Sequence, residues 1–208
     1  GKRDNQSAEQ ILSNCFVLQI VVSFILTAVL LIWSEDILLA FGASENTISY
    51  AVDYMHIYAI GTLFVQLTLG INAFITAQDS LLISMVSVLI GAICNITLDP
   101  VFIFAFHMGV KGAALATVIS QAISTIWVVS FLCGKKTHLH LRKKYMRLEP
   151  KVFVHVSLLG RSAFIMQASE SIVTVCFNSS LLRYGGDIAV GAMTILTSVM
   201  QFAMLPLR

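Results

Sequence analysis

Residues 91–106 read GAICNITLDPVFIFAF and set a carboxylate, Asp99, beside a proline within a run of apolar side chains. The run suits the centre of a lipid bilayer and predicts a membrane-spanning helix. An unpaired charge in that position costs about 2.5 to 3.5 kcal/mol on insertion scales. Because a charge without a purpose would be disfavoured there, Asp99 is the first candidate functional residue.

The whole chain has the composition of a membrane protein. Apolar residues make up 57% of its 208 residues and charged residues only 12%, which indicates an all-α protein that crosses the bilayer several times. Each crossing takes about 20 largely apolar residues, and none of the apolar segments alternates as a barrel strand would. Six spanning helices are predicted, near residues 9–33, 48–77, 81–106, 110–133, 152–183 and 187–207.

One loop holds much of the positive charge. Seven basic residues fall within 134–151: Lys135, Lys136, Arg142, Lys143, Lys144, Arg147 and Lys151. Loops rich in Lys and Arg stay in the cytoplasm, so this loop is expected on the cytoplasmic side of a cell membrane. Alternation then places SEDILLAFGASEN (34–46) and RYGGD (183–187) on the outer side. The loop could also bind anionic lipid. We favour the interpretation that its basic residues lie in water and only set the orientation of the helices.

Asp99 has polar neighbours in its own segment. Asn95 precedes it by four residues, which is about one helical turn, so both lie on one face. Pro100 lacks an N–H and clashes with the carbonyl four residues before it, so the carbonyl of Ile96 is expected to lose its helical partner. A carboxylate, an amide and a freed carbonyl offer the oxygen ligands that a hard cation such as Na⁺ prefers.

The next segment supplies matching polar residues. If the two helices form an antiparallel hairpin that turns near Met108, Asp99 faces the level of Thr117, and Asn95 faces the level of Gln121. Each pair is spaced four residues apart, so both helices are predicted to present two polar groups to one pocket. The alternative is that the uncharged residues only cross-link the helices. For the charged Asp99 we favour a functional role.

Several stretches resemble a known transporter family. NITLDPVFIF (95–104) followed by GVKGAALATVISQ (109–121) resembles the fifth and sixth helices of the multidrug and toxic compound extrusion (MATE) transporters. YGGDIAVGAMTILTSVMQFAMLPL (184–207) resembles their eighth helix, and GKRDNQSAEQILSN (1–14) is similar to the start of the third. The resemblance covers the whole chain, and the order of these stretches makes it specific.

The resemblance implies twelve helices in two six-helix lobes, which exchange a cation for an organic cation or another amphiphilic drug. The six segments match helices three to eight, so the chain is expected to be a fragment. Residues 1–133 would be the C-terminal part of the N-lobe, 134–151 the cytoplasmic loop between lobes, and 152–208 the start of the C-lobe. Expected partners are the remaining helices, the lipid bilayer, small amphiphilic substrates and the coupling cation.

The resemblance also implies a cation site. In archaeal and bacterial members, the N-lobe site combines an Asp of the first helix with the Asn and Asp of an NxxxDP stretch and a Thr of the sixth helix. The positions that match are Asn95, Asp99 and Thr117. The first helix lies outside the match, so its Asp has no counterpart here. Gln121 and Pro100 are expected to support the site.

Glu170 is a second acid within an apolar segment. Some branches of the family carry a seventh-helix Glu there that takes part in cation coupling, although they usually read LGxP where this chain has Leu159 to Ser162. We favour a cation or substrate role for Glu170, with a helix contact as the alternative. Arg161 lies nine residues earlier on the opposite face, so a pair is not expected. It is expected to reach lipid phosphates or water.

Other polar residues carry weaker signals. Asp53 and His56 could hold a metal, but a solvated helix end is favoured. Asn72 and Gln78 lie where the family's fourth helix ends, and no role is carried over for them because the neighbouring residues differ. The four cysteines show no metal spacing and are interpreted as packing residues: Cys15, Cys94, Cys133 and Cys176.

Two other classes of function compete with drug export. A flippase for lipid-linked saccharides, from the same superfamily, would need a cavity ringed by Arg, and the interior of the spanning segments offers only Arg161. An enzyme would need a convergent nucleophile and base, and neither Asp99 nor Glu170 has a visible catalytic partner. We expect no enzyme, no cofactor, no resident metal and no nucleic-acid partner. The sequence leaves the drug open, as well as the choice between Na⁺ and H⁺.

Overall fold

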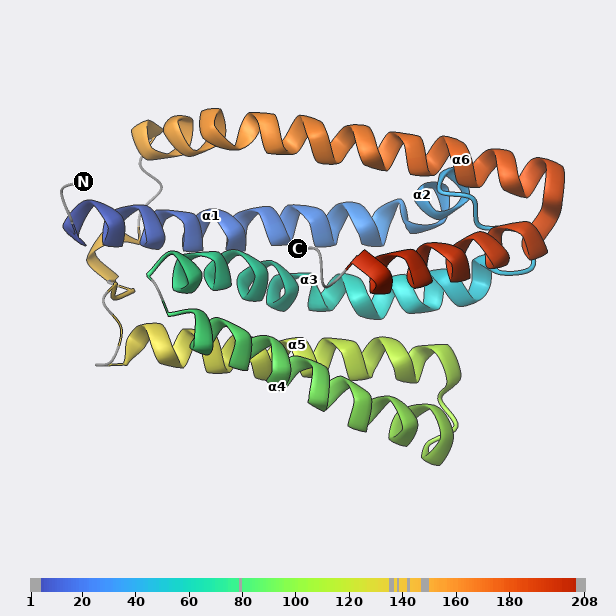
Figure 1. Cartoon of the computed structure of the whole chain (residues 1–208), viewed down its shortest axis with the longest axis horizontal. Coiled ribbons are helices and arrows are strands. Elements are labelled where there is room, and N and C mark those ends of the chain that lie inside the picture. The colour runs from blue at the N-terminus through green and yellow to red at the C-terminus, as the bar shows by residue number, and fades with distance from the viewer. Residues whose placement is uncertain are drawn as a thin grey trace. The chain divides into compact units, whose positions relative to one another are not determined.

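The computed structural model describes residues 5–78, 80–134, 137, 139–141, 143–146 and 150–204, and these residues fold into helices and short connections. Figure 1 shows them in order. The elements are α1 (Asn5–Ile32), α2 (Ser34–Ala40), α3 (Ile48–Ala77), α4 (Leu81–Pro100), the π-helical turn η1 (Val101–Ala105), α5 (Gly109–Cys133), the 3₁₀ turn η2 (Lys143–Tyr145) and α6 (Pro150–Met204).

The long helices confirm the predicted membrane fold. Within the described residues, α1, α3, α4 with η1, α5 and α6 are each long and apolar enough to cross a bilayer. The apolar part of α6, Val152–Ala203, has 52 residues, which as one straight helix would measure about 78 Å and exceed a 30 Å hydrocarbon core more than twofold. At Gly186 the backbone leaves the helical region (φ 64°, ψ −166°), and α6 folds back into two arms there.

Packing divides the chain into two compact units. The first comprises Gly1–Ser34 and Val52–Leu159, and the second comprises Glu35–Ala51 and Gly160–Arg208. In the first unit, α1, α3 and α5 share a core that also receives two leucines of the segment after α5. The buried members are Leu12, Leu67, Ile71, Ile75, Val128 and Leu132, and the leucines packed against them are Leu139 and Leu141.

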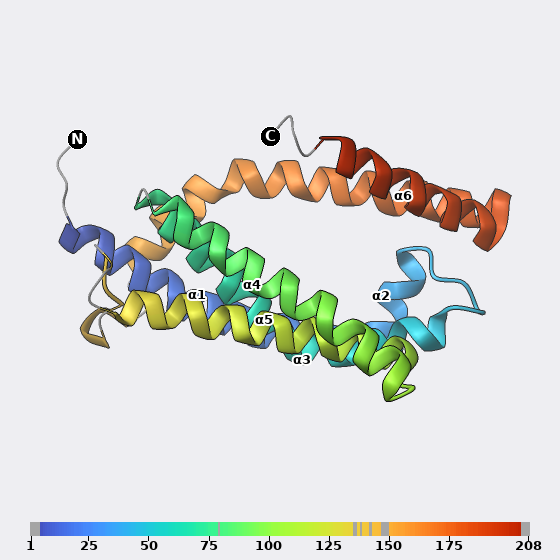
Figure 2. The same ribbon diagram turned by 60° about the horizontal axis from the view of Figure 1, so that its bottom comes forward.

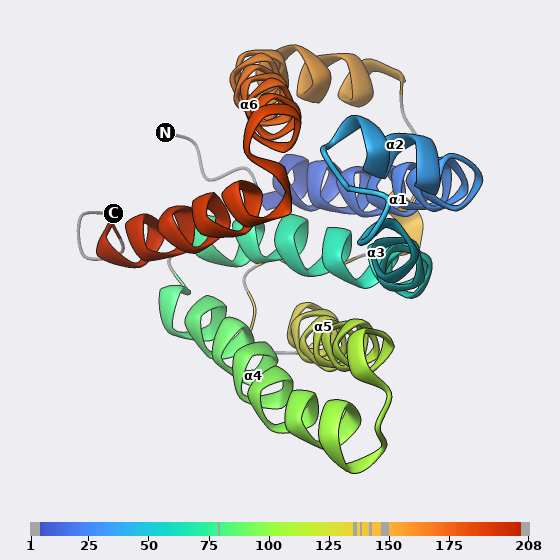
Figure 3. The same cartoon turned by 90° about the vertical axis from the view of Figure 1, so that its right-hand side faces the viewer.

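Glycines let α3 approach both of its neighbours in the first unit. A Cβ on Gly61 would collide with the side chain of Val118 in α5, and a Cβ on Gly70 would collide with Gln19 of α1. Figure 3 shows α3 between α1 and α5 as a result. Small residues are a common means of helix contact in membranes, because lipid removes the hydrophobic drive for association.

The helices α4 and η1 form a hairpin with α5. Figure 2 shows the two arms joined at one end. The connection contains His107 and Gly109, both with positive φ (53° and 55°), and the N–H of Met108 donates to the carbonyl of Phe102 (3.1 Å). This hairpin, predicted from the sequence, carries the polar residues of the candidate site.

Candidate functional site

The side-chain amide of Asn95 links the two arms of the hairpin. Its Nδ2 lies 3.4 Å from Oδ1 of Asp99 on the same helix and 3.3 Å from Oγ1 of Thr117 on α5. All three side chains are half-buried. Sequence reasoning therefore placed these three residues together correctly. The amide donates to both oxygens, which gives a carboxylate, an amide and a hydroxyl in one cluster.

The register of the hairpin differs from the prediction. Equal counting from Met108 set Asn95 opposite Gln121, whereas its amide reaches Thr117, four residues nearer the turn. The π-helical turn η1 contributes a small part of this difference, because such a turn holds more residues and advances less along the axis than an α-helical turn. Asn95 consequently lies closer to the turn than an α-helical rise of 1.5 Å per residue indicates.

The hydroxyl of Thr117 has two roles. It donates to the carbonyl of Ala113 one turn earlier (3.0 Å) and accepts from Asn95. Rotating the Asn95 amide by half a turn would exchange Nδ2 for Oδ1 and direct three oxygens to one point. Carboxylate, amide and hydroxyl oxygens form the donor set that suits a hard cation, and the carboxylate can equally bind a proton.

Pro100 ends α4 and lies directly before the π-helical turn. The N–H of Val101 bonds to the carbonyl of Leu98, and η1 begins at that residue. Proline removes a helical donor and crowds the preceding turn, so an irregularity at this point follows from the sequence. The release of the Ile96 carbonyl stays a prediction.

Gln121 contributes its backbone rather than its side chain to the described contacts. Its carbonyl accepts hydrogen bonds from the hydroxyls of Thr125 (2.7 Å) and Thr68 (3.4 Å). The two hydroxyls are 2.7 Å apart, so they join α3 to α5 at this level. A supporting role for the side chain of Gln121 in the cluster stays a prediction.

Glu170 lies in the second unit, on the first arm of α6. Its side chain is exposed, and Oε2 accepts from Nε2 of Gln167 (3.2 Å). Arg161 is also exposed. The described hydrogen bonds of Glu170 thus stay within its own helix, and its proposed role in coupling stays a prediction.

Asp53 and His56 have separate partners. Oδ2 of Asp53 pairs with Nζ of Lys111 at the start of α5 (3.2 Å), and Nε2 of His56 lies 3.1 Å from Oγ of Ser34. Over the described part of the chain, no three His, Cys, Asp or Glu side chains converge in a way that could hold a metal. The ion pair between α3 and α5 was missed in the sequence, because a pair 58 positions apart leaves no local pattern.

The segment after α5 is held on the first unit by side chains of α1 and α3. Oε1 of Gln78 accepts from the Thr137 hydroxyl (2.9 Å) and from the Leu139 N–H (3.1 Å). Oε1 of Glu9 accepts from the N–H of His140 (3.2 Å), and Nδ2 of Asn14 donates to a carbonyl in η2 (3.3 Å). The sequence predicted this segment only as a basic loop, so its attachment to the helices is new information.

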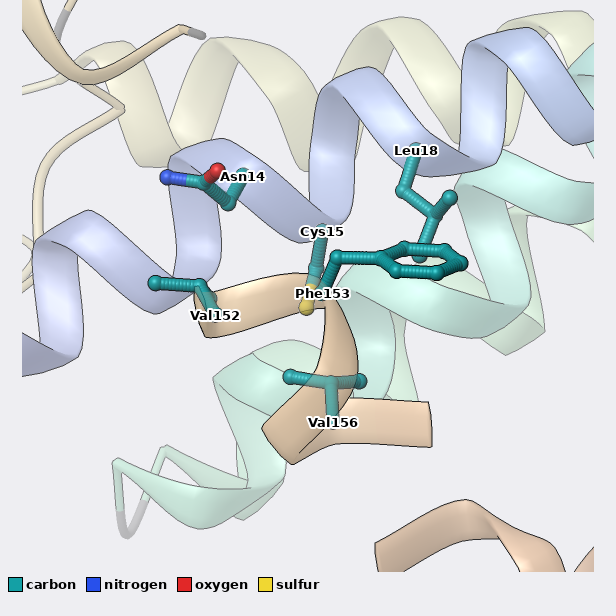
Figure 4. Close-up of a pocket in the computed structure, with 6 residues that line it drawn as sticks. All are labelled: Asn14, Cys15, Leu18, Val152, Phe153 and Val156. Carbon is teal, nitrogen blue, oxygen red and sulfur yellow. The ribbon is translucent and has the colours of Figure 1, made fainter. Parts of the chain in front are cut away.

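A shallow apolar pocket also lies in the first unit, away from the cluster. Figure 4 shows its lining, which comes from α1 and the start of α6: Asn14, Cys15, Leu18, Val152, Phe153 and Val156. Its cavity volume is about 10 Å³, which is about the space of one water molecule. Pockets that bury a drug-sized molecule measure about 300 to 1,000 Å³, so this one is too small for such a ligand.

Comparisons with known proteins agree on one family. A family model described as MatE matches residues 1–101. The multidrug export protein MepA of Staphylococcus haemolyticus is 28% identical over 202 residues, which cover 97% of this chain and 44% of that protein. MepA of Staphylococcus aureus strain N315 is 25% identical over 97% of this chain and 45% of its own length.

Solved structures show the same fold. The chain matches the inward-facing conformation of a multidrug resistance MATE family transporter with a TM-score of 0.90 and 21% identity, over 99% of this chain and 47% of that one. It matches the MATE multidrug transporter DinF-BH with a TM-score of 0.80 and 28% identity, over 97% and 50%.

The chain spans less than half the length of the curated relatives it matches. The relatives and the solved structures cover nearly the whole chain, and the range of the family model includes Asn95 and Asp99. Together with its apolar helices, these matches identify an integral membrane protein. Over nearly its whole length the chain is similar to multidrug export proteins and transporters of the MATE family, and the MatE family model matches its first 101 residues.

Proposed function

We propose that this chain is part of a cation-coupled antiporter that exports drugs or other amphiphilic organic compounds by alternating access. The relatives named as multidrug export proteins support the direction and the class of substrate. Because the chain spans less than half of their length, the activity would belong to a longer polypeptide that supplies further helices. The chain's own contribution is the cluster of Asn95, Asp99 and Thr117.

The observation that carries the proposal is the bridge from Asp99 through the Asn95 amide to Thr117. It places a carboxylate on a membrane-spanning helix within reach of neutral oxygen ligands on that helix and the next. An acid inside a membrane segment is costly and marks an ion or proton pathway by default. A purely structural link between two helices would need only the neutral amide and hydroxyl.

The coupling step follows from the charge of this cluster. A cation or proton at Asp99 neutralises the carboxylate, and its departure restores the charge. The two charge states would favour different arrangements of the hairpin, and substrate affinity would change with that equilibrium. The π-helical turn η1 lies directly between the cluster and the hairpin connection, so a change at Asp99 can be passed to a segment whose helical bonding is already irregular.

Glu170 is proposed as a second carboxylate for coupling or substrate binding. It is an acid on a membrane-spanning arm and its side chain is exposed, so it is available to a cation or a basic drug. The primary proposal does not depend on it, because the cluster on the hairpin already contains a carboxylate and its ligands.

The test is drug efflux from lipid vesicles that contain the complete transporter, driven by an imposed gradient. A Na⁺ gradient and an H⁺ gradient are applied separately, and a vesicle without either gradient is the control. We expect one gradient to drive efflux at least tenfold faster than the control in the wild-type protein. Efflux at the same rate with and without both gradients would reject cation coupling.

A further inference from the structure

The segment Glu35–Ala51 packs with a part of the chain far from it in sequence. It connects α1 and α3, the helices of the first unit, but it forms one compact unit with Gly160–Arg208. The first arm of α6 from Gly160 onward and the turn at Gly186 belong to that unit. A connection between two helices of one lobe therefore reaches helices that the family resemblance assigns to the other lobe.

Three contacts attach this segment to α6. Nδ2 of Asn46 donates to Oδ2 of Asp187, next to the α6 turn, at 3.3 Å. The hydroxyl of Ser179 donates to the carbonyl of Ala40, the last residue of α2, also at 3.3 Å. Between these bonds, Gly42 lies directly against Asn178. The contacts fall on the end of the first arm of α6 and on the turn after it.

Gly42 allows the segment to lie close to Asn178 of α6. A Cβ built on it would lie 3.1 Å from Cβ of Asn178 and 3.3 Å from its carbonyl carbon, closer than side chains ordinarily pack. Its positive φ of 94° also ends α2, since Gly42 and Ala43 donate back to the carbonyls of Leu39 and Leu38. Gly42 therefore ends α2 and also allows the close contact with α6. The contact with Asn178 leaves little space for a side chain at position 42.

The chemistry of the contact is suited to repeated opening. Asn46 and Asp187 are both exposed, and hydrogen bonds between groups in water form and break at little net cost. The segment and the turn overlap stretches that are predicted on the outer side of the membrane. An exporter releases its substrate on that side. An exporter must open that side once in each cycle.

We propose that residues 35–51 form an outer clasp that holds the release side closed, and that the bond between Asn46 and Asp187 breaks each time the transporter opens outward. This inference rests on the proposed function, since it assigns the clasp to alternating access. Closure by the clasp would favour the state that takes up substrate from the cytoplasm. Separation of the clasp from the α6 turn would accompany release.

A cleavable cross-link tests the contact and its movement together. Cysteines replace Asn46 and Asp187 in the full-length transporter, with its native cysteines changed to alanine, and a short thiol-specific bifunctional reagent that a reductant cleaves joins them. We expect cross-linking to abolish gradient-driven efflux and reduction to restore it. The control pair is Asn46→Cys with Thr197→Cys, because residue 197 lies ten positions, or about 15 Å, further along the second arm.

The outcomes separate the clasp from the proposed function. Failure of positions 46 and 187 to cross-link, or full efflux after cross-linking, would overturn the clasp. Absence of efflux before any reagent is added would count against the proposed function instead. The clasp would then be tested by the rate at which a cysteine at position 178 is labelled.

The labelling experiment uses Asn178→Cys, a half-buried position against Gly42. Asn46→Asp sets two carboxylates against each other, so an impermeant maleimide should label position 178 several-fold faster in that variant. Exchange of the pair, Asn46→Asp with Asp187→Asn, restores an amide opposite a carboxylate and should return the rate to its original value. Equal labelling of all three proteins would overturn the clasp.

Discussion

The amide of Asn95 lies 3.3 Å from the hydroxyl oxygen of Thr117, across the two arms of the hairpin formed by α4 and α5. The same amide lies 3.4 Å from the carboxylate of Asp99. One neutral side chain thus connects the charged residue to the second helix. A change of charge on Asp99 is felt by the amide, and through the amide by α5.

Removing the hydroxyl of Thr117 should weaken coupling without unfolding the protein. Thr117→Ala deletes one neutral ligand and leaves the carboxylate, so we expect gradient-driven efflux to fall by about threefold to tenfold, a loss of roughly 0.7 to 1.4 kcal/mol. Thr97→Ala is the matched control, because the exposed hydroxyl of Thr97 bonds only to the backbone of its own helix. Equal losses of efflux in the two variants would show that Thr117 does not take part in the site.

Replacing the carboxylate itself should have a larger effect on coupling than on folding. Asp99→Asn keeps the shape of the side chain and removes the cost of a charge in the membrane, so the variant should insert and fold. We expect efflux to lose its dependence on the gradient, while drug binding measured without a gradient is retained. Wild-type efflux by this variant, at matched expression, would reduce Asp99 to a structural residue.

The main features of the fold follow from the sequence, because in a bilayer every backbone polar group must find a partner within the protein. Long apolar segments therefore had to be helices, and the six expected crossings match the long helices once α6 is divided at Gly186. The cluster was also predictable. Asn95 and Asp99 share a face by their spacing of four, and a short connection brings the next helix alongside.

What the sequence could not supply is the register of that hairpin. The π-helical turn Val101–Ala105 shortens the path from Asn95 to the connection, and apolar residues VFIFA carry no signal for one type of helix over another. The bonds of Gln78 to Thr137 and Leu139 were equally hidden. They join a side chain to groups 59 and 61 positions away, partly through the backbone, which has no residue-specific signature.

The contact between α3 and α5 at Gly61 should not tolerate a methyl group. Alanine in place of glycine normally favours a helix by about 0.5 to 1 kcal/mol, but its Cβ would collide with Val118. Overpacking typically costs about 1 to 3 kcal/mol, so Gly61→Ala should lower the midpoint of thermal unfolding in detergent. Gly160→Ala, where a Cβ meets no atom within 4 Å, should not.

The same position offers a compensating change. Val118→Ala removes the methyl groups that a Cβ on Gly61 would strike, so the double variant should recover at least half of the stability that Gly61→Ala loses. Additive losses in the double variant would mean that the two residues do not share a contact.

The predicted orientation can be checked with single cysteines in a protein whose native cysteines are changed to alanine. Lys144 in η2 and Glu45 before α3 belong to stretches predicted on opposite sides of the membrane, and Glu45 is exposed. In intact cells an impermeant maleimide should label Glu45→Cys and leave Lys144→Cys unlabelled until the membrane is permeabilised. Labelling of position 144 in intact cells would reverse the topology.

Gln78 should control whether the segment after α5 stays attached to the first unit. Gln78→Ala removes the acceptor of the Leu139 N–H and one of the two acceptors near the Thr137 hydroxyl, which retains the Leu139 carbonyl. Leaving the Leu139 N–H without a partner costs about 1 to 3 kcal/mol. The segment should detach rather than bear that cost, so trypsin should cut at Lys143 or Lys144 at least tenfold faster in inside-out membrane vesicles.

Two further variants distinguish a lost acceptor from a general disturbance of α3. Gln78→Glu keeps the accepting oxygen and replaces Nε2, a buried atom without a hydrogen-bond partner among the described residues, by a second oxygen. It should therefore retain the resistance of the wild type to trypsin. Gln66→Ala truncates a half-buried glutamine of α3, the helix that ends just before Gln78, and should also remain resistant. Rapid cleavage of all three variants would show that the segment is held by something other than the carbonyl oxygen of Gln78.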